Sequence, residues 1–124
     1  MDILIVEDEA ILAMEYMMIL NGLGFPSVEH AFDAAAALAA VERCLPKMIL
    51  LDIKLRGEID GIAVAEAIRS RHDVPIVFIT SYSDADTLAR ARRTRPAYIL
   101  SKIGDRRELC RVVAELMNSR RWSA

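Results

Sequence analysis

The residues Met48, Ile49, Leu50 and Leu51 form an apolar run that ends abruptly on the carboxylate of Asp52. Four apolar residues without alternation are typical of a strand covered on both faces, as in a parallel sheet. In open α/β sheets, ligands bind at the carboxyl ends of the strands, where loops and helix N-termini meet. The run therefore predicts a central buried strand, with Asp52 either at a ligand-binding edge or simply opening a turn.

Strand and helix patterns alternate along the rest of the chain. Further strands are predicted at residues 3–6, 26–31, 76–79 and 97–100. The first helix is indicated by apolar residues at three- and four-residue spacing, which are Ile11, Leu12, Met14, Met18 and Ile19. The later helices are predicted to begin at capping residues, which are Asp33, Asp60, Ser83 with Asp86, and Asp105 with Glu108. The helix opened by Ser83 is expected over residues 84–93.

Five strand-then-helix units predict the α/β class, since each right-handed crossover must cover the sheet. We expect a doubly wound five-stranded parallel sheet in the flavodoxin-like order 2-1-3-4-5, with helices on both faces. That order places Cys44 and Cys110 on opposite faces, which disfavours a disulfide and predicts free thiols.

Length and composition predict one domain over residues 1–124, with 54% hydrophobic residues to build its core. The apolar runs are far shorter than the roughly 18 residues that span a bilayer, which predicts a cytoplasmic protein without membrane contact. A net charge of −2 argues against direct nucleic-acid binding. Residues 1–62 hold 4 Lys or Arg against 11 Asp or Glu, whereas residues 63–124 hold 12 against 7. This uneven charge indicates either a solvated helix face or a surface for an acidic partner.

Four of the predicted strands end in polar residues, and a parallel sheet brings these residues to one edge. They are Glu7 with Asp8, Asp52, Thr80 and Lys102. Three clustered carboxylates repel one another unless a cation lies among them, and oxygen ligands suit Mg²⁺. The hydroxyl of Thr80 and the ammonium of Lys102 suit phosphoryl oxygens. The set predicts a phosphoryl-transfer site in which Asp52 is the nucleophile.

The chain resembles a bacterial response-regulator receiver domain from end to end. Five segments in the family's order carry the resemblance, which are residues 3–9 (ILIVEDE), 51–55 (LDIKL), 60–61 (DG), 75–81 (PIVFITS) and Lys102. The resemblance implies that Asp52 takes a phosphoryl group from a phosphohistidine of a sensor histidine kinase or phosphotransfer protein.

The resemblance also implies a role for each matching residue. Asp8, Asp52 and the backbone carbonyl of Lys54 would bind Mg²⁺ directly, and Glu7 would act through water. Thr80 and Lys102 would hold the phosphoryl oxygens. Their movement would switch a surface formed by the fourth helix, fifth strand and fifth helix, which would contact a downstream protein or a second copy of the chain. Such a domain assists its own phosphorylation and dephosphorylation but is not an enzyme in the usual sense.

Three departures from the family pattern have structural consequences. Ile103 stands where proline usually follows the lysine, which predicts a trans peptide bond between Lys102 and Ile103 because a cis bond without proline costs ~2.5–4 kcal/mol. Ile99 stands where an aromatic switch residue is usual, and Tyr98 lies one place earlier, so its side chain should point to the opposite face. Tyr82 is a possible substitute, and the loop after Asp52 is one residue longer than usual.

Three alternative functions remain open. A haloacid-dehalogenase-type phosphatase would need a second Asp two residues after Asp52, where this chain has Lys54. A flavodoxin-like FMN carrier would need a phosphate-binding first loop, which Glu7 and Asp8 would repel. A degenerate receiver, acting as a phosphorylation-independent binding module, is consistent with Ile99 and Ile103. The chain is not expected to include an output domain, so output should pass through protein contacts.

Overall fold

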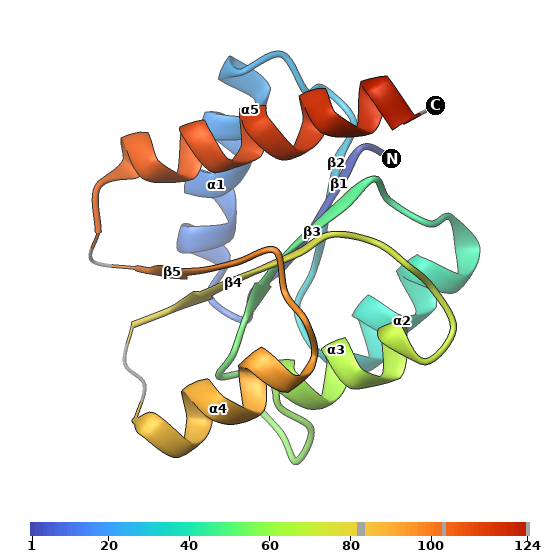
Figure 1. The fold of residues 1–124 in the computed structure, drawn as a ribbon, viewed down its shortest axis with the longest axis vertical. Coiled ribbons are helices and arrows are strands. Elements are labelled where there is room, and N and C mark those ends of the chain that lie inside the picture. The colour runs from blue at the N-terminus through green and yellow to red at the C-terminus, as the bar shows by residue number, and fades with distance from the viewer. Residues whose placement is uncertain (82–83, 103, 124) are drawn as a thin grey trace.

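The sequence folds into five parallel strands and five helices in strict alternation, as Figure 1 shows for this computed structural model. The structure describes residues 1–81, 84–102 and 104–123. The strands are β1 (Ile3–Val6), β2 (Val28–Ala31), β3 (Met48–Asp52), β4 (Ile76–Thr80) and β5 (Tyr98–Ser101). The helices are α1 (Ala10–Gly22), α2 (Ala34–Arg43), α3 (Gly61–Arg69), α4 (Ala85–Arg93) and α5 (Arg106–Ser123).

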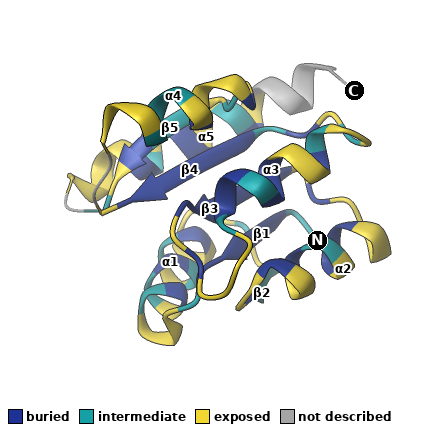
Figure 2. Cartoon of the chain, turned by 90° about the horizontal axis from the view of Figure 1, so that it is seen from below, coloured by how far each residue is buried: buried dark blue, intermediate teal, exposed yellow. Residues whose placement is uncertain are grey.

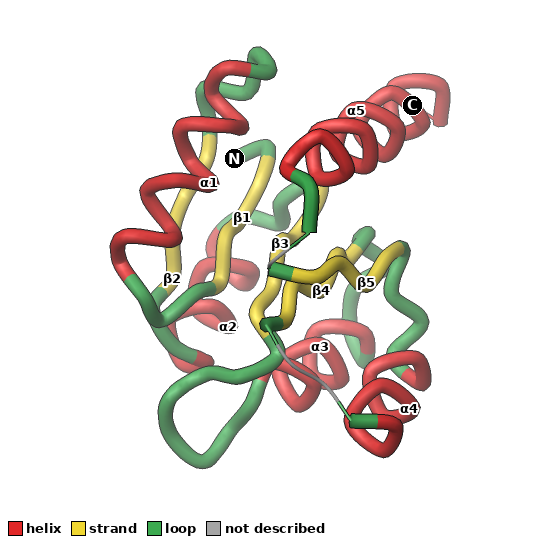
Figure 3. The backbone as a smooth tube through the Cα atoms, turned by 90° about the vertical axis from the view of Figure 1, so that its left-hand side faces the viewer, coloured by secondary structure: helices red, strands yellow, loops and turns green. Residues whose placement is uncertain are grey.

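The strand order is β2-β1-β3-β4-β5, as the sequence predicted. Helices α1 and α5 cover one face of the sheet, and α2, α3 and α4 cover the other (Figures 1 and 3). Cys44 follows α2 and Cys110 lies in α5, so the two thiols are free and belong to opposite layers. The doubly wound α/β prediction is therefore confirmed.

The central strands are buried because helices pack on both of their faces. Every residue of β1, β3 and β4 is buried, and most of the exposed residues lie on the outer helix faces and loops (Figure 2). Alternate residues of β3 point to opposite layers: Ile49 and Leu51 join the core under α2 and α3, while Met48 and Leu50 join the core under α1 and α5. This double burial explains why β3 reads as an unbroken apolar run.

Two capping predictions are confirmed and one is corrected. Asp33 Oδ1 accepts a hydrogen bond from the Ala36 amide at 2.8 Å, and Asp60 Oδ1 accepts one from Ala63 at 2.9 Å. The N-cap of α4 is Asp84, one residue later than predicted, because its Oδ1 accepts a hydrogen bond from the Thr87 amide at 2.7 Å. Ser83 lies outside the described residues.

Helix α1 forms where the sequence predicted it, but most of its apolar pattern faces solvent. Its buried residues are Ala13, Tyr16 and Leu20. Ile11, Met14 and Met18 are 79%, 63% and 72% exposed. Because α1 is apolar nearly all round, the spacing alone did not show which face packs on the sheet.

Candidate functional site

The carboxyl ends of four strands meet at one edge of the sheet and carry all the predicted site residues. In the strand register, Val6 pairs with Leu51, Asp52 with Ile79, and Thr80 with Ser101. The next residues after β1 are Glu7 and Asp8, and Lys102 directly follows β5. The structure therefore brings the predicted residues from β1, β3, β4 and β5 to a single place.

Three carboxylates form the acidic part of this edge. Glu7, Asp8 and Asp52 each offer an oxygen within 4.8 Å of the others. Glu7 is 1% exposed and Asp52 is 4% exposed, so the repulsion between their charges is poorly screened by water. An all-oxygen cluster of this size fits a hard divalent cation such as Mg²⁺.

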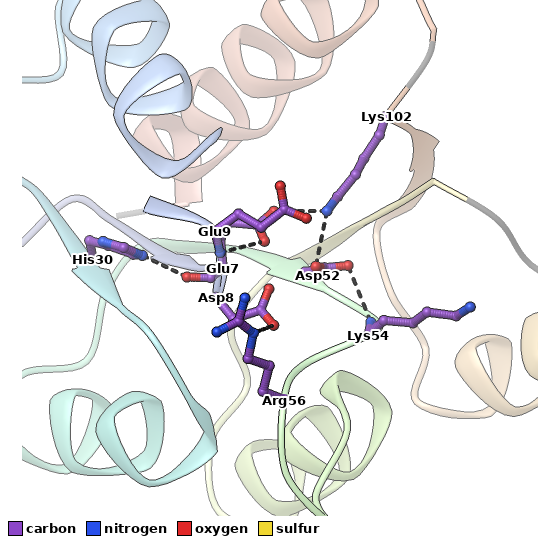
Figure 4. Close-up of polar contacts among 8 residues, drawn as sticks. All are labelled: Glu7, Asp8, Glu9, His30, Asp52, Lys54, Arg56 and Lys102. Atoms are coloured by element: carbon purple, nitrogen blue, oxygen red, sulfur yellow. Dashed lines mark hydrogen bonds and ion pairs between the residues drawn. The ribbon is translucent and has the colours of Figure 1, made fainter. Parts of the chain in front are cut away.

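The ammonium of Lys102 lies between two of these carboxylates, as Figure 4 shows. Its Nζ donates a hydrogen bond to Asp52 Oδ2 at 3.0 Å and lies 3.0 Å from Glu7 Oε1. This Glu7 oxygen is buried, and among the described residues its polar partner is the Lys102 ammonium. An oxygen in that state has lone pairs available to a metal-bound water.

Burial and charge shift the pKa values of Glu7 and Lys102. Burial raises the pKa of Glu7 to about 7, the charge of Asp52 adds to the rise, and Lys102 and the Glu9 amide oppose it. Burial also disfavours the charged form of Lys102, but its pairs with Glu7 and Asp52 outweigh burial and raise its pKa above the usual value. The ammonium is therefore a permanent positive charge at neutral pH.

Backbone amides orient two of the carboxylates. The Lys54 amide donates to Asp52 Oδ1 at 3.2 Å, and the Glu9 amide donates to Glu7 Oε2 at 3.2 Å. The Lys54 side chain extends away from Asp52 in Figure 4, so this residue contributes its backbone to the site. A Lys54 side chain in that position is not a general acid, which removes support for the phosphatase alternative.

Gly61 brings the start of α3 against the backbone of Asp52. A Cβ on Gly61 would lie 1.9 Å from the Asp52 carbonyl oxygen and 2.9 Å from Ile53 Cα. The Gly61 amide donates to the Ile53 carbonyl at 2.7 Å. Only glycine allows this approach, which holds the β3 end and the following loop in position.

Arg56 is a site residue that the sequence analysis missed. Its Nε lies 3.5 Å from Asp8 Oδ2, and its side chain is 84% exposed (Figure 4). No motif indicated this contact, because an exposed loop arginine has no sequence signal that distinguishes it from a solvated one.

The structure also places the predicted switch residues. Thr80 is 6% exposed at the end of β4, and its carbonyl accepts a hydrogen bond from the Lys102 amide at 2.9 Å. Tyr98 packs against the α1 and α5 layer, where its hydroxyl donates to Glu115 at 2.9 Å, whereas Ile99 packs against the opposite layer. The predicted opposite orientation of Tyr98 is confirmed. The predictions on Tyr82 and on the peptide bond before Ile103 lie outside the described residues.

Comparison with known proteins decides the family. A family model described as "Response regulator receiver domain" matches residues 3–114. The chain belongs to the response-regulator receiver domain family. This family membership excludes the phosphatase and the flavin carrier, because both of those alternatives belong to other families.

Individual relatives agree with this assignment. The chain is 36% identical over 90 residues to the transcriptional regulatory protein PdtaR of Mycobacterium tuberculosis, covering 73% of this chain and 43% of PdtaR. It is 34% identical over 115 residues to the DNA-binding response regulator MtrA of Mycolicibacterium paratuberculosis, covering 92% of this chain and 50% of MtrA. The crystal structure of the receiver domain of NtrX from Brucella abortus superposes on this chain with a TM-score of 0.86 at 31% sequence identity. The superposition covers 94% of this chain and 98% of the NtrX receiver domain.

This receiver domain spans half or less of the length of these two curated relatives. Among the described residues, no helix is long and apolar enough to cross a membrane.

Proposed function

We propose that this receiver domain accepts a phosphoryl group on Asp52 in a Mg²⁺-dependent reaction. The donor is the phosphohistidine of a sensor histidine kinase or of a phosphotransfer protein. One observation carries the proposal: the Asp52 carboxylate is 4% exposed at the end of the central strand, between the carboxylates of Glu7 and Asp8 and the ammonium of Lys102. The proposed domain is a cytoplasmic signalling module that assists its own phosphorylation and dephosphorylation.

Asp52 acts as the nucleophile in this proposal. One of its carboxylate oxygens attacks phosphorus, a P–O bond forms, and the P–N bond breaks with its electron pair left on the imidazole nitrogen. The Lys54 amide and the Lys102 ammonium each bond one Asp52 oxygen, which fixes the carboxylate for in-line attack. The Thr80 hydroxyl and the Lys102 ammonium then stabilise the charge on the transferred phosphoryl oxygens.

The acidic cluster supplies the ligands for the metal in this proposal. Asp8, Asp52 and the Lys54 carbonyl would hold Mg²⁺ directly, and Glu7 would hold it through water. When bound, Mg²⁺ neutralises the phosphoryl oxygens and the repulsion among the carboxylates. Lys102 pairs with Glu7 and Asp52, whereas Asp8 pairs only with the exposed Arg56 among the described residues, so Asp8 is the carboxylate most open to a divalent cation.

Intact mass after incubation with acetyl phosphate tests this function. We expect the wild-type protein to gain one phosphoryl group with Mg²⁺ and to lose that gain with excess chelator. Asp52→Asn keeps the side-chain shape, removes the nucleophile and should show no gain, whereas Asp73→Asn, at an exposed carboxylate in the loop before β4 and so at the opposite edge of the sheet, should react like the wild type. A wild type that stays unmodified with saturating Mg²⁺ would favour the phosphorylation-independent binding module.

For output, the proposal is that a downstream protein or a second copy of the chain binds the surface of α4, β5 and α5. Four arginines of α4 and α5 are paired with carboxylates, in the ion pairs Arg90–Asp60, Arg106–Glu15, Arg107–Asp105 and Arg111–Glu115. Arg92 and Arg93 are exposed and have no ion pair among the described residues. These two side chains therefore offer unpaired positive charge to an acidic partner.

Charge reversal at these two positions tests the output surface. We expect Arg92→Glu with Arg93→Glu to weaken self-association or partner capture after phosphorylation by about tenfold or more, since it adds repulsion as well as removing attraction. Arg71→Glu, at an exposed ion pair near the C-terminus of α3, is the control. Unchanged association and unchanged kinase-dependent output in the double variant would show that this surface is not the output contact.

A further inference from the structure

Each carboxylate of the acidic cluster has a basic side chain of the same chain as its counter-ion. Lys102 lies 3.0 Å from both Glu7 and Asp52, and Arg56 lies 3.5 Å from Asp8 (Figure 4). The protein therefore carries its own cations at the place where the proposed function puts a divalent metal.

The two basic residues differ sharply in burial. The Lys102 side chain is 11% exposed and the Arg56 side chain is 84% exposed. Moving a buried ammonium away from two buried carboxylates would leave their charges uncompensated, which is costly. The exposed Arg56 can leave at little cost because water solvates its guanidinium, and the incoming cation takes over the compensation of Asp8, whose side chain is 14% exposed. A cation that enters the cluster therefore displaces Arg56 and leaves Lys102 in place.

The loop between β3 and α3 makes this displacement possible. Gly57 directly follows Arg56 with a φ of +103°, a left-handed conformation that turns the chain back sharply. A Cβ on Gly57 would meet nothing within 4 Å, so the turn lies in open space. The Arg56 side chain is itself 84% exposed, so it can swing outward without disturbing packed side chains.

Resting on the proposed Mg²⁺ site, we infer that Arg56 is an intramolecular competitor for the divalent cation. It compensates Asp8 in the metal-free protein and has to leave when the cation binds. Arg56 thus sets the Mg²⁺ concentration at which the domain becomes competent for phosphoryl transfer, while taking no part in the transfer itself. It is a residue that tunes metal affinity.

Calorimetric titration with Mg²⁺ tests the inference on the intact chain. We expect Arg56→Ala to tighten Mg²⁺ binding about two- to fivefold, the range that an exposed ion pair supports. Arg56→Glu should tighten it further, and Arg56→Lys should stay near the wild type because it keeps the charge. Arg43→Ala is the matched control, since it removes another exposed arginine, one that pairs with Glu29 and not with the cluster. Its effect should be small, because charges farther apart than about 8 Å are largely screened at physiological ionic strength.

Three further readouts separate competition from a structural role. The difference between Arg56→Ala and the wild type should shrink as salt is raised, because salt screens an exposed pair. In the wild type, the NMR signal of the Arg56 side-chain Nε–Hε group should shift as Mg²⁺ is added. Phosphorylation by acetyl phosphate should be faster in Arg56→Ala at subsaturating Mg²⁺ and equal to the wild type at saturation.

The outcomes are distinguishable. Equal or weaker Mg²⁺ binding by Arg56→Ala overturns the inference but leaves the proposed metal site intact. A wild type that binds no Mg²⁺ at millimolar concentrations overturns the metal site, and with it the role of Arg56.

Discussion

Gly61→Ala is expected to destabilise the domain by about 3–5 kcal/mol, the upper end of what single substitutions cost. The new Cβ would lie 1.9 Å from the Asp52 carbonyl oxygen, and the atoms it meets are backbone atoms that no side-chain rotation can move. Either α3 has to move away from β3 or the end of β3 has to shift. Both changes break the 2.7 Å hydrogen bond from the Gly61 amide to the Ile53 carbonyl.

Urea unfolding curves measure this cost, with Gly22→Ala as the control. Gly22 ends α1, and a Cβ there would meet nothing within 4 Å, so alanine should be neutral or stabilise by up to about 1 kcal/mol. A Gly61→Ala variant within 1 kcal/mol of the wild type would show that the β3 end tolerates displacement. Close approach of Gly61 would then not be what holds Asp52 in position.

Lys102→Met is expected to destabilise the metal-free protein by about 3–5 kcal/mol at pH 8, the usual cost of removing one partner of a buried ion pair. Methionine fills a similar volume, but Glu7 and Asp52 then lose the ammonium that lies 3.0 Å from each. The same variant should also lose most of its phosphoryl transfer, because Lys102 holds a phosphoryl oxygen in the proposed mechanism.

The pH dependence of this loss identifies its cause. The pKa of Glu7 is already raised to about 7 in the folded protein against an ordinary value of 4.5, and removing Lys102 raises it further. A raised carboxyl pKa means that the folded state binds the proton more tightly, so stability falls as pH rises above 4.5 until it passes the folded pKa. The Lys102→Met defect should therefore be smaller at pH 5 than at pH 8.

Thermal or urea unfolding at the two pH values checks this prediction. Adding Glu7→Gln to Lys102→Met should recover stability at pH 8, since it removes one of the two unpaired charges. Lys47→Met, which removes an exposed lysine that pairs with Asp2, should stay within about 0.5 kcal/mol of the wild type. A pH-independent defect in Lys102→Met would point to lost packing rather than lost charge compensation.

The features that the sequence predicted correctly are those set by burial on both faces of the sheet. The unbroken apolar run predicted the central strand β3, and the alternation of strands and helices predicted a parallel sheet, for which the expected five-stranded order is the one observed. The positions of Asp52 and Thr80 at strand ends followed directly, because parallel strands place their carboxyl ends at one edge. Tyr98 was predicted to face away from the usual switch position because strand residues alternate with a period of two.

The features that the sequence did not predict depend on contacts between segments. The exposure of Met14 and Met18 on α1 could not be read from spacing, because the helix offers apolar residues in every direction. The contact of Arg56 with Asp8 depends on the path of a loop, and the closeness of Gly61 to Asp52 depends on how α3 approaches β3. The cap of α4 was misplaced by one residue because neighbouring polar residues compete for the same helix start.

The most direct test of the central claim is to locate the phosphoryl group. Borohydride reduces an aspartyl phosphate to homoserine, so treatment after incubation with acetyl phosphate and Mg²⁺ marks the modified position permanently, and peptide mass spectrometry then reads it. We predict homoserine at position 52 alone, and none when Mg²⁺ is removed by chelation. Homoserine at position 8 instead, or an unmodified Asp52 in protein that has gained a phosphoryl group, would contradict the assignment.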